Sequence, residues 1–168
     1  VYPRSIEILD EHTSVEPSDP YSAMHLTRER FFSGLSTMPV GVLRCTQISS
    51  PEDTHNAYGP NRFRKMAEQE GRIQLFGKGE DRRDHITAGD VAALIYRCLL
   101  KRSHGILNVA SGRSLSFAEV AEIVGGCFTP PPHLEFLPRA IPLTHRYFNI
   151  GLLKQMFPDF GFTPLEVD

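Results

Sequence analysis

The sequence predicts an α/β protein. Short apolar runs rich in β-branched residues alternate with longer segments of helix-forming residues, and glycine or proline separates them. Strands that alternate with helices in this way are typical of α/β folds with parallel strands. The chain contains no internal repeat or low-complexity tract. A length of 168 residues fits one domain, or a large domain with a small one.

Glycine, proline and capping residues set the expected limits of the helices. The proline-rich stretch 17–20 disfavours regular structure, so residues 1–20 are expected to form a surface loop. Ser116 and Glu119 have capping-box spacing, and Asp90 is expected to cap its own helix. Helices are therefore predicted over residues 21–36, 61–70, 91–102, 114–128 and 149–157.

Apolar runs predict the strands. Residues 39–48 and 105–111 are the most apolar of these runs and are expected to form buried strands. Shorter strands are predicted over 73–76, 82–86 and 134–137, with a turn at 77–81 and a proline linker at 130–132.

Charge and composition argue against several kinds of protein. The net charge is −2 and the isoelectric point is about 6.4, so binding of nucleic acid through a basic surface is not expected. We see no apolar run of about 18 residues and no leader-like segment, so neither a membrane span nor a signal peptide is expected. The widely spaced Cys45, Cys98 and Cys127 are expected to be reduced core thiols of a cytoplasmic protein.

The histidines and serines match no familiar metal or hydrolase motif. None of the seven histidines has the spacing H-x-H, H-x-x-x-H or H-E-x-x-H, and the sequence has no C-x-x-C pair. It also lacks the G-x-S-x-G pattern of a serine nucleophile. Neither a metal site nor hydrolase chemistry is therefore expected.

Five segments follow one another in a recognisable order. They are VY at 1–2, PSDPYSAMHLTRE at 17–29, VLRCTQI with AYGPNRF at 42–48 and 57–63, LFGKGEDRRDHITAGDVAALI at 75–95, and GILNVASGRSLSFAEVAEIV at 105–124. The second is similar to P-x-x-P-Y-x-x-x-K, the third to L-R-x-x-N-x-Y-G-P, and the fourth to L-F-G-D-G-x-x-x-R-D-F-I-H-V-D-D-V-A. In this order and spacing the chain resembles the extended short-chain dehydrogenase/reductase family, in its branch of NAD-dependent nucleotide-sugar epimerases and dehydratases.

The resemblance implies the C-terminal half of such an enzyme. The expected fold is the C-terminal part of a Rossmann-like parallel sheet with a small α+β substrate-binding domain. Residues 1–58 would belong to the dinucleotide-binding domain and 59–168 mainly to the substrate-binding domain, with 89–111 returning to the sheet. We find no glycine-rich turn that would seat a pyrophosphate, so this chain is expected to be a fragment that is inactive alone.

The resemblance assigns both catalysis and cofactor binding to Tyr21 and His25. In the family this tyrosine exchanges a proton with a sugar hydroxyl, and a lysine one helical turn later lowers its pKa. His25 stands in the lysine position, where a neutral imidazole can form hydrogen bonds but carries no permanent charge. A histidinium held by Glu29, a charge supplied by Arg28, or a changed role for the protein are the open hypotheses.

The resemblance assigns substrate binding to Arg83, Arg146, Leu75 and Phe76. Arg83 would bind the diphosphate of a nucleotide sugar, because guanidinium groups bind phosphate oxygens in pairs. An ion pair with a neighbouring aspartate is the alternative. Arg146 lies near the family's second diphosphate-binding arginine, and Leu75 with Phe76 would line the base pocket or simply pack in the core.

The intact protein is expected to be an NAD(P)-dependent nucleotide-sugar epimerase or dehydratase. The cofactor would be NAD or NADP, the partner a nucleotide-sugar substrate, and an open sheet edge would favour a homodimer. A non-catalytic nucleotide-sugar-binding or scaffold protein is one alternative, which His25 favours. An NAD(P)-dependent reductase of a small carbonyl compound is another.

Overall fold

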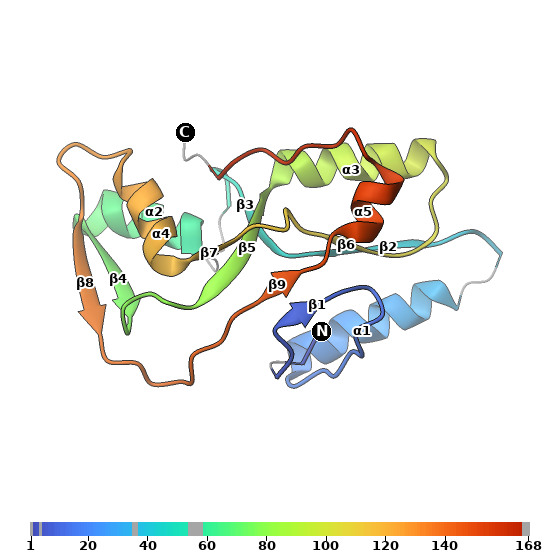
Figure 1. The fold of residues 1–168 in the computed structure, drawn as a ribbon, viewed down its shortest axis with the longest axis horizontal. Coiled ribbons are helices and arrows are strands. Elements are labelled where there is room, and N and C mark those ends of the chain that lie inside the picture. Colours follow the sequence, from blue (N-terminus) through green and yellow to red (C-terminus); the bar gives the residue numbers. More distant parts are fainter. Residues whose placement is uncertain (1, 4, 35–36, 54–58, 166–168) are drawn as a thin grey trace.

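A computed structural model describes residues 2–3, 5–34, 37–53 and 59–165 (Figure 1). The helices are α1 (Pro20–Ser33), α2 (Gly59–Glu70), α3 (Ala88–Leu100), α4 (Phe117–Gly125) and α5 (Gly151–Met156). The strands are β1 (Ile8–Leu9), β2 (Gly41–Cys45), β3 (Gln47–Ser49), β4 (Arg72–Phe76), β5 (Arg82–Thr87), β6 (Gly105–Val109), β7 (Ser114–Ser116), β8 (His133–Leu137) and β9 (Tyr147–Phe148). This order confirms the α/β class. The expected helix end at 35–36, the motif residues 57–58 and the domain boundary at 58 lie outside the described residues.

Most strand pairs are parallel. β2 pairs with β6 from Gly41 opposite Gly105 to Cys45 opposite Val109, and β4 pairs with β8. β5 lies between β3, which is parallel to it, and β7, which is antiparallel. Helices α1 and α3 lie on opposite faces of the β2–β6 pair (Figure 1), an arrangement typical of layered α/β folds.

The stretch expected as one strand, 39–48, is divided at Thr46. The Thr46 N–H donates to the carbonyl of Val109 at 3.0 Å, and its hydroxyl donates to the carbonyl of Asp84 at 2.9 Å. The chain thereby changes partners, from β6 along β2 to β5 along β3. The sequence pattern missed this break because no glycine or proline between residues 42 and 49 marks it.

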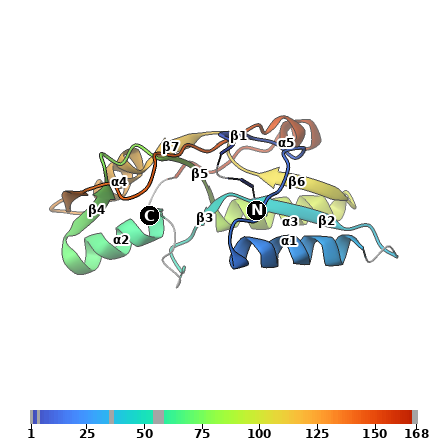
Figure 2. The same cartoon turned by 90° about the horizontal axis from the view of Figure 1, so that it is seen from below.

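Two hydrophobic clusters form the core of the part of the chain that the structure describes. One joins α2, β4, β7 and α4, and contains Phe63, Ile73 and Val120. The other joins β5, α3, β6 and α5, and contains Leu94 and Phe157. Figure 2 shows α2 and α4 at one end of the molecule and α1 and α3 at the other. The proposed division into domains stays a prediction.

Capping explains where the helices begin. Ser116 and Glu119 form the expected capping box of α4, with Ser116 as the N-cap. The helix predicted from residue 114 nevertheless begins later, because 114–116 forms strand β7 beside β5. Asp90 is not the N-cap of α3; Thr87 is, and Asp90 is the third residue of its capping box.

The N-terminal segment is more ordered than the expected loop. β1 pairs in parallel with β9, a strand that the sequence pattern did not indicate. Two-residue strands leave little periodicity in a sequence, and this pair joins segments that are more than 130 residues apart.

Cys45 and Cys98 are half-buried, but Cys127 is exposed just after α4, so the expectation of three core thiols is wrong for Cys127.

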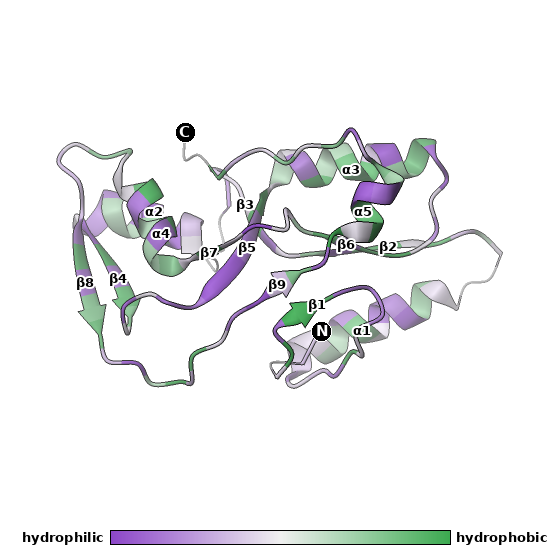
Figure 3. Cartoon of the chain, viewed as in Figure 1, coloured by the Kyte–Doolittle hydropathy of each residue, from purple (hydrophilic) through white to green (hydrophobic). Residues whose placement is uncertain are grey.

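Within the described part of the chain, no helix is long and apolar enough to cross a membrane. Figure 3 colours most of β5 as hydrophilic, although this strand lies between two others. Two polar residues of β5, Arg83 and His85, line cavities.

Candidate active site

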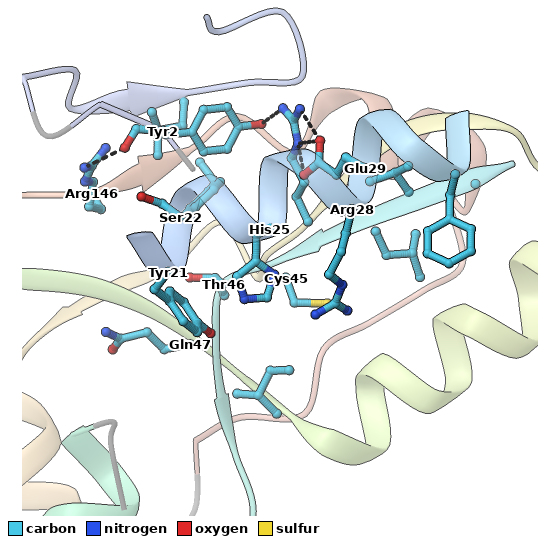
Figure 4. Close-up of a pocket in the computed structure, with 18 of the residues that line it drawn as sticks. Tyr2, Tyr21, Ser22, His25, Arg28, Glu29, Cys45, Thr46, Gln47 and Arg146 are labelled. Atoms are coloured by element: carbon cyan, nitrogen blue, oxygen red, sulfur yellow. Dashed lines mark hydrogen bonds and ion pairs between the residues drawn. The ribbon is translucent and has the colours of Figure 1, made fainter. Parts of the chain in front are cut away.

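Helix α1 presents a row of polar side chains to a cleft of about 800 Å³. Tyr21, His25 and Arg28 lie along this side of the helix, which rests beside β2 and β3 (Figure 4). Asp19 begins the helix by accepting a hydrogen bond from the Ser22 N–H at 2.8 Å, and Pro20 occupies its first turn. Tyr21 is therefore held at the start of a capped helix.

Tyr21 and His25 meet edge to face, with ring centroids 4.4 Å apart. Their spacing of four residues places them on the same side of α1, as expected from the sequence. The Tyr21 side chain is accessible, because the residue is 63% exposed. A phenol in this position can exchange a proton with a molecule in the cleft.

Among the described residues, Glu29 forms no hydrogen bond or ion pair with His25. It lines the same cleft, but its carboxylate accepts hydrogen bonds from the Arg44 Nε and Nη2 atoms, the latter at 2.7 Å (Figure 4). Both side chains of this ion pair are largely buried. Arg44 also donates to the hydroxyl of Tyr2 at 3.0 Å. The described contacts therefore give no support to a histidinium stabilised by Glu29.

Arg28 is a cation of α1 that faces the cleft. Its side chain is exposed and lines the cleft with His25, and no hydrogen bond or ion pair joins it to another described residue. Arg28 is thus available to interact with an anion beside Tyr21.

Arg83 lines the same cleft, but its guanidinium is held by the protein. It donates to the Thr144 carbonyl at 2.8 Å and to the Thr144 hydroxyl at 2.7 Å, and it lies 5.9 Å from the centre of the Phe117 ring. Asp81 forms an ion pair with Arg139, and the charges of Arg139 and Arg83 both contribute to lowering the pKa of Asp81. Arg82 pairs with Glu119 at 2.9 Å.

Arg146 reaches the cleft from the segment before β9. It donates to the backbone carbonyls of Pro3 at 2.6 Å and Ile6 at 3.1 Å. The sequence motif predicts only a phosphate ligand at Arg146, and the structure adds that this residue fastens the N-terminal segment.

Leu75 and Phe76 do not line the cleft that contains Tyr21. Leu75 is 1% exposed and belongs to the core cluster of α2 and α4, whereas Phe76 is 49% exposed at the end of β4. The structure thus brings Tyr21, His25, Arg83 and Arg146 together and leaves this pair elsewhere. Their role at a nucleotide base stays a prediction.

Two cleft residues were not singled out from the sequence. The side-chain oxygen of Gln47 is buried without a hydrogen-bond partner among the described residues, and Gln47 lines the cleft together with Tyr21 (Figure 4). Burial raises the pKa of the Cys45 thiol to about 11, so at neutral pH this thiol is protonated and is a poor nucleophile. Only the packing of β2 and β3 against α1 reveals both positions.

The fold and this cleft define an α/β protein with parallel strands and a tyrosine-bearing helix. Residues 1–110 match the model of the NAD dependent epimerase/dehydratase family. The chain therefore belongs to the NAD-dependent epimerase/dehydratase family.

Solved structures support the same fold. An ADP-L-glycero-D-manno-heptose-6-epimerase from Helicobacter pylori matches 99% of this chain with a TM-score of 0.82 and 19% identity. MoeE5 in complex with UDP-glucose and NAD matches 98% with a TM-score of 0.81 and 18% identity. TunA, an NAD-dependent NDP-hexosamine 5,6-dehydratase involved in tunicamycin biosynthesis, matches 93% with a TM-score of 0.78 and 22% identity. The matches cover 54%, 57% and 53% of those chains, so this chain spans about half their length.

Proposed function

We propose that this chain forms the substrate side of an NAD-dependent nucleotide-sugar epimerase or dehydratase, with Tyr21 as its general acid/base. The observation that carries the proposal is the accessible Tyr21 phenol in a cleft that also contains His25, Arg83 and Arg146. The family match and the nucleotide-sugar enzymes of the same fold support it.

The residues present fit part of a dinucleotide site. The cleft is large enough for a cofactor fragment together with a sugar, and Tyr21 and His25 offer it hydrogen-bonding groups. NAD would accept a hydride from the sugar and return it. Tyr21 would hold the proton that leaves the sugar hydroxyl during that exchange. His25 would hydrogen-bond either the phenol or the cofactor.

Charge near Tyr21 is the second part of the proposal. In water a tyrosine has a pKa of about 10, so a nearby cation favours the phenolate needed to accept a proton. A histidine side chain lacks the permanent charge of a lysine. Arg28, on the same side of α1, would supply the positive charge, since Glu29 is engaged with Arg44.

Binding of UDP-glucose to the full chain tests the substrate assignment. We expect Arg83→Ala to weaken binding, measured by isothermal titration calorimetry, by about tenfold or more, because a charge-assisted contact to phosphate is lost. The control Arg62→Ala, at an exposed position of α2, should bind as the parent does. Equal affinity of the parent and Arg83→Ala would contradict the assignment and favour a small carbonyl substrate.

Turnover in the longest form of the protein that contains this chain tests the chemistry. We expect Tyr21→Phe to reduce kcat by at least about 100-fold, since general acid/base catalysis contributes on that order. His25→Lys should raise kcat. Retained UDP-glucose binding with no turnover in the parent or in His25→Lys at any pH would instead favour a non-catalytic binding protein.

The proposal also includes that the protein forms a homodimer and is located in the cytoplasm. Four apolar side chains of α1 and the following segment, namely Met24, Phe31, Phe32 and Met38, are exposed, and a second copy of the chain would bury them. Size-exclusion chromatography with light scattering would show a dimer mass.

A further inference from the structure

A second cavity lies at the carboxyl-terminal side of β5, away from the Tyr21 cleft. Its volume is about 270 Å³, and it shares none of its described lining residues with that cleft. His85 of β5, the turn after β6, helix α5 and the segment 160–165 surround it. Thr163 fastens this segment, because its N–H and hydroxyl donate to the Asp90 carboxylate at 3.2 and 2.9 Å.

His85 is a buried polar side chain that faces this cavity. The residue is 6% exposed, and neither ring nitrogen has a hydrogen-bond partner among the described residues. Buried polar side chains are nearly always hydrogen-bonded, by protein, water or ligand. Burial lowers the pKa of His85 to about 4, so at neutral pH the imidazole offers one donor and one acceptor.

The remaining walls combine apolar rings with positive charge. Phe160 and Phe162 pack edge to face, with centroids 5.0 Å apart, and Leu115 and Ile150 are among the other apolar residues of the lining. Aromatic and aliphatic walls of this kind favour a flat apolar ligand.

Two exposed cations, Arg113 and Lys154, also line the cavity. Their side chains make no hydrogen bond or ion pair with another described residue. No carboxylate belongs to the described lining, because Asp84 and Asp90 lie behind it, bound to Ser111 and Thr163. The cavity therefore favours an anion.

We propose that this cavity binds a small carboxylic acid whose carboxylate meets Arg113 and Lys154, whose ring lies against the phenylalanines, and whose second polar group hydrogen-bonds His85. The three features occur together at this one place, and each recognises a different part of such a molecule. The site is independent of the function proposed for the Tyr21 cleft.

Three probes of one size test the proposal by titration into the 168-residue chain. Para-hydroxybenzoate has all three features, benzoate lacks the hydroxyl, and para-hydroxybenzamide lacks the charge. In two-dimensional amide NMR we expect para-hydroxybenzoate to shift resonances of Ser111, Leu115 and Phe162. Benzoate should bind about fivefold more weakly because it lacks the hydrogen bond of the hydroxyl. Para-hydroxybenzamide should bind about tenfold more weakly because it lacks the charge-assisted hydrogen bond of the carboxylate.

Variants assign each feature to its residue. Arg113→Gln combined with Lys154→Gln should reduce the affinity for para-hydroxybenzoate to that of the benzamide, while the control Lys65→Gln leaves it unchanged. His85→Phe should abolish the difference between para-hydroxybenzoate and benzoate. The cation variants lie at exposed positions, so they test the proposal even if His85→Phe does not fold.

Three results would overturn the proposal. The first is no shift at the cavity with para-hydroxybenzoate at about 10 mM, which would mean a dissociation constant well above the millimolar range. The second is equal binding of the charged and uncharged probes. The third is shifts confined to residues of the Tyr21 cleft.

Discussion

At the scale of single residues, neighbours decide what each charged side chain can do. Glu29 is one turn from His25, yet its carboxylate forms an ion pair with Arg44. Arg146 lines the cleft and at the same time holds the backbone of Pro3. Arg28, in contrast, remains available to the cleft. A charge pattern read from sequence therefore names the candidates, but the tertiary contacts select among them.

His85 makes the stability of the protein depend on pH. Its pKa is about 4 in the folded protein, against 6.5 for an unperturbed histidine. Between these values the unfolded chain binds a proton that the folded chain does not, so stability is lost as the pH falls from 6.5 towards 4. The expected loss is about 1.4 kcal/mol per pH unit, or roughly 3 kcal/mol in all.

Urea unfolding at pH 7 and pH 4.5 measures this effect. The decrease in the free energy of unfolding should be smaller in His85→Phe, which cannot take up the proton. A matched variant of an exposed histidine, His104→Asn, should show the same decrease as the parent. Identical pH dependence in the parent and His85→Phe would contradict the buried, neutral imidazole.

At the scale of elements, short polar segments decide where strands and helices begin. Ser116 ends β7 and caps α4, so one residue closes a strand and opens a helix. Thr87 does the same between β5 and α3. Because β5 carries both Arg83 and His85, these caps also position the two candidate sites.

Removal of a cap should destabilise the protein measurably. Ser116→Ala leaves the Glu119 N–H, which now binds the serine hydroxyl at 3.1 Å, without its partner. The expected cost is about 1 kcal/mol in the free energy of unfolding, measured by denaturant titration. Ser14→Ala, whose hydroxyl binds no other described residue, should cost almost nothing. An equal effect of both changes would show that the cap does not contribute.

At the scale of the whole molecule, contacts between distant segments hold the N-terminal region against the rest. The Tyr147 N–H donates to the Glu7 carbonyl and the Asn149 N–H to the Leu9 carbonyl, both at 2.8 Å. The β1–β9 pair and the Arg146 guanidinium therefore fasten the segment before α1. That segment carries Tyr2, which in turn supports Arg44.

Arg146→Gln should loosen this attachment. We expect the amide protons of Tyr147 and Asn149 to exchange with solvent about tenfold faster, because local opening becomes easier by about 1.4 kcal/mol. Hydrogen exchange followed by NMR measures the rates, and amides of β2 serve as an internal reference. Unchanged rates at Tyr147 and Asn149, with Arg62→Gln as the control, would show that the β1–β9 pair suffices alone.

Sequence reasoning worked best where a local signal exists. Apolar periodicity predicted the helices at 61–70 and 91–102, and Ser116 with Glu119 predicted a helix start, because capping depends on residues three apart. It failed at Thr46 and at β9, where the deciding hydrogen bonds join segments far apart in the chain. It also placed Tyr21 and His25 on one side of a helix, which α1 confirms.

The sequence by itself determined the α/β class, the family and the shared helical side of Tyr21 and His25. Local patterns and ordered motifs are enough for these, since they depend on residues near each other in the chain. Only the tertiary structure decided that Glu29 forms an ion pair with Arg44 and that Leu75 is buried in the core. It also decided that His85, without a hydrogen-bond partner among the described residues, lines the same cavity as Arg113 and Lys154. The physical reason is that partners, burial and charge at a site come from segments that only folding brings together.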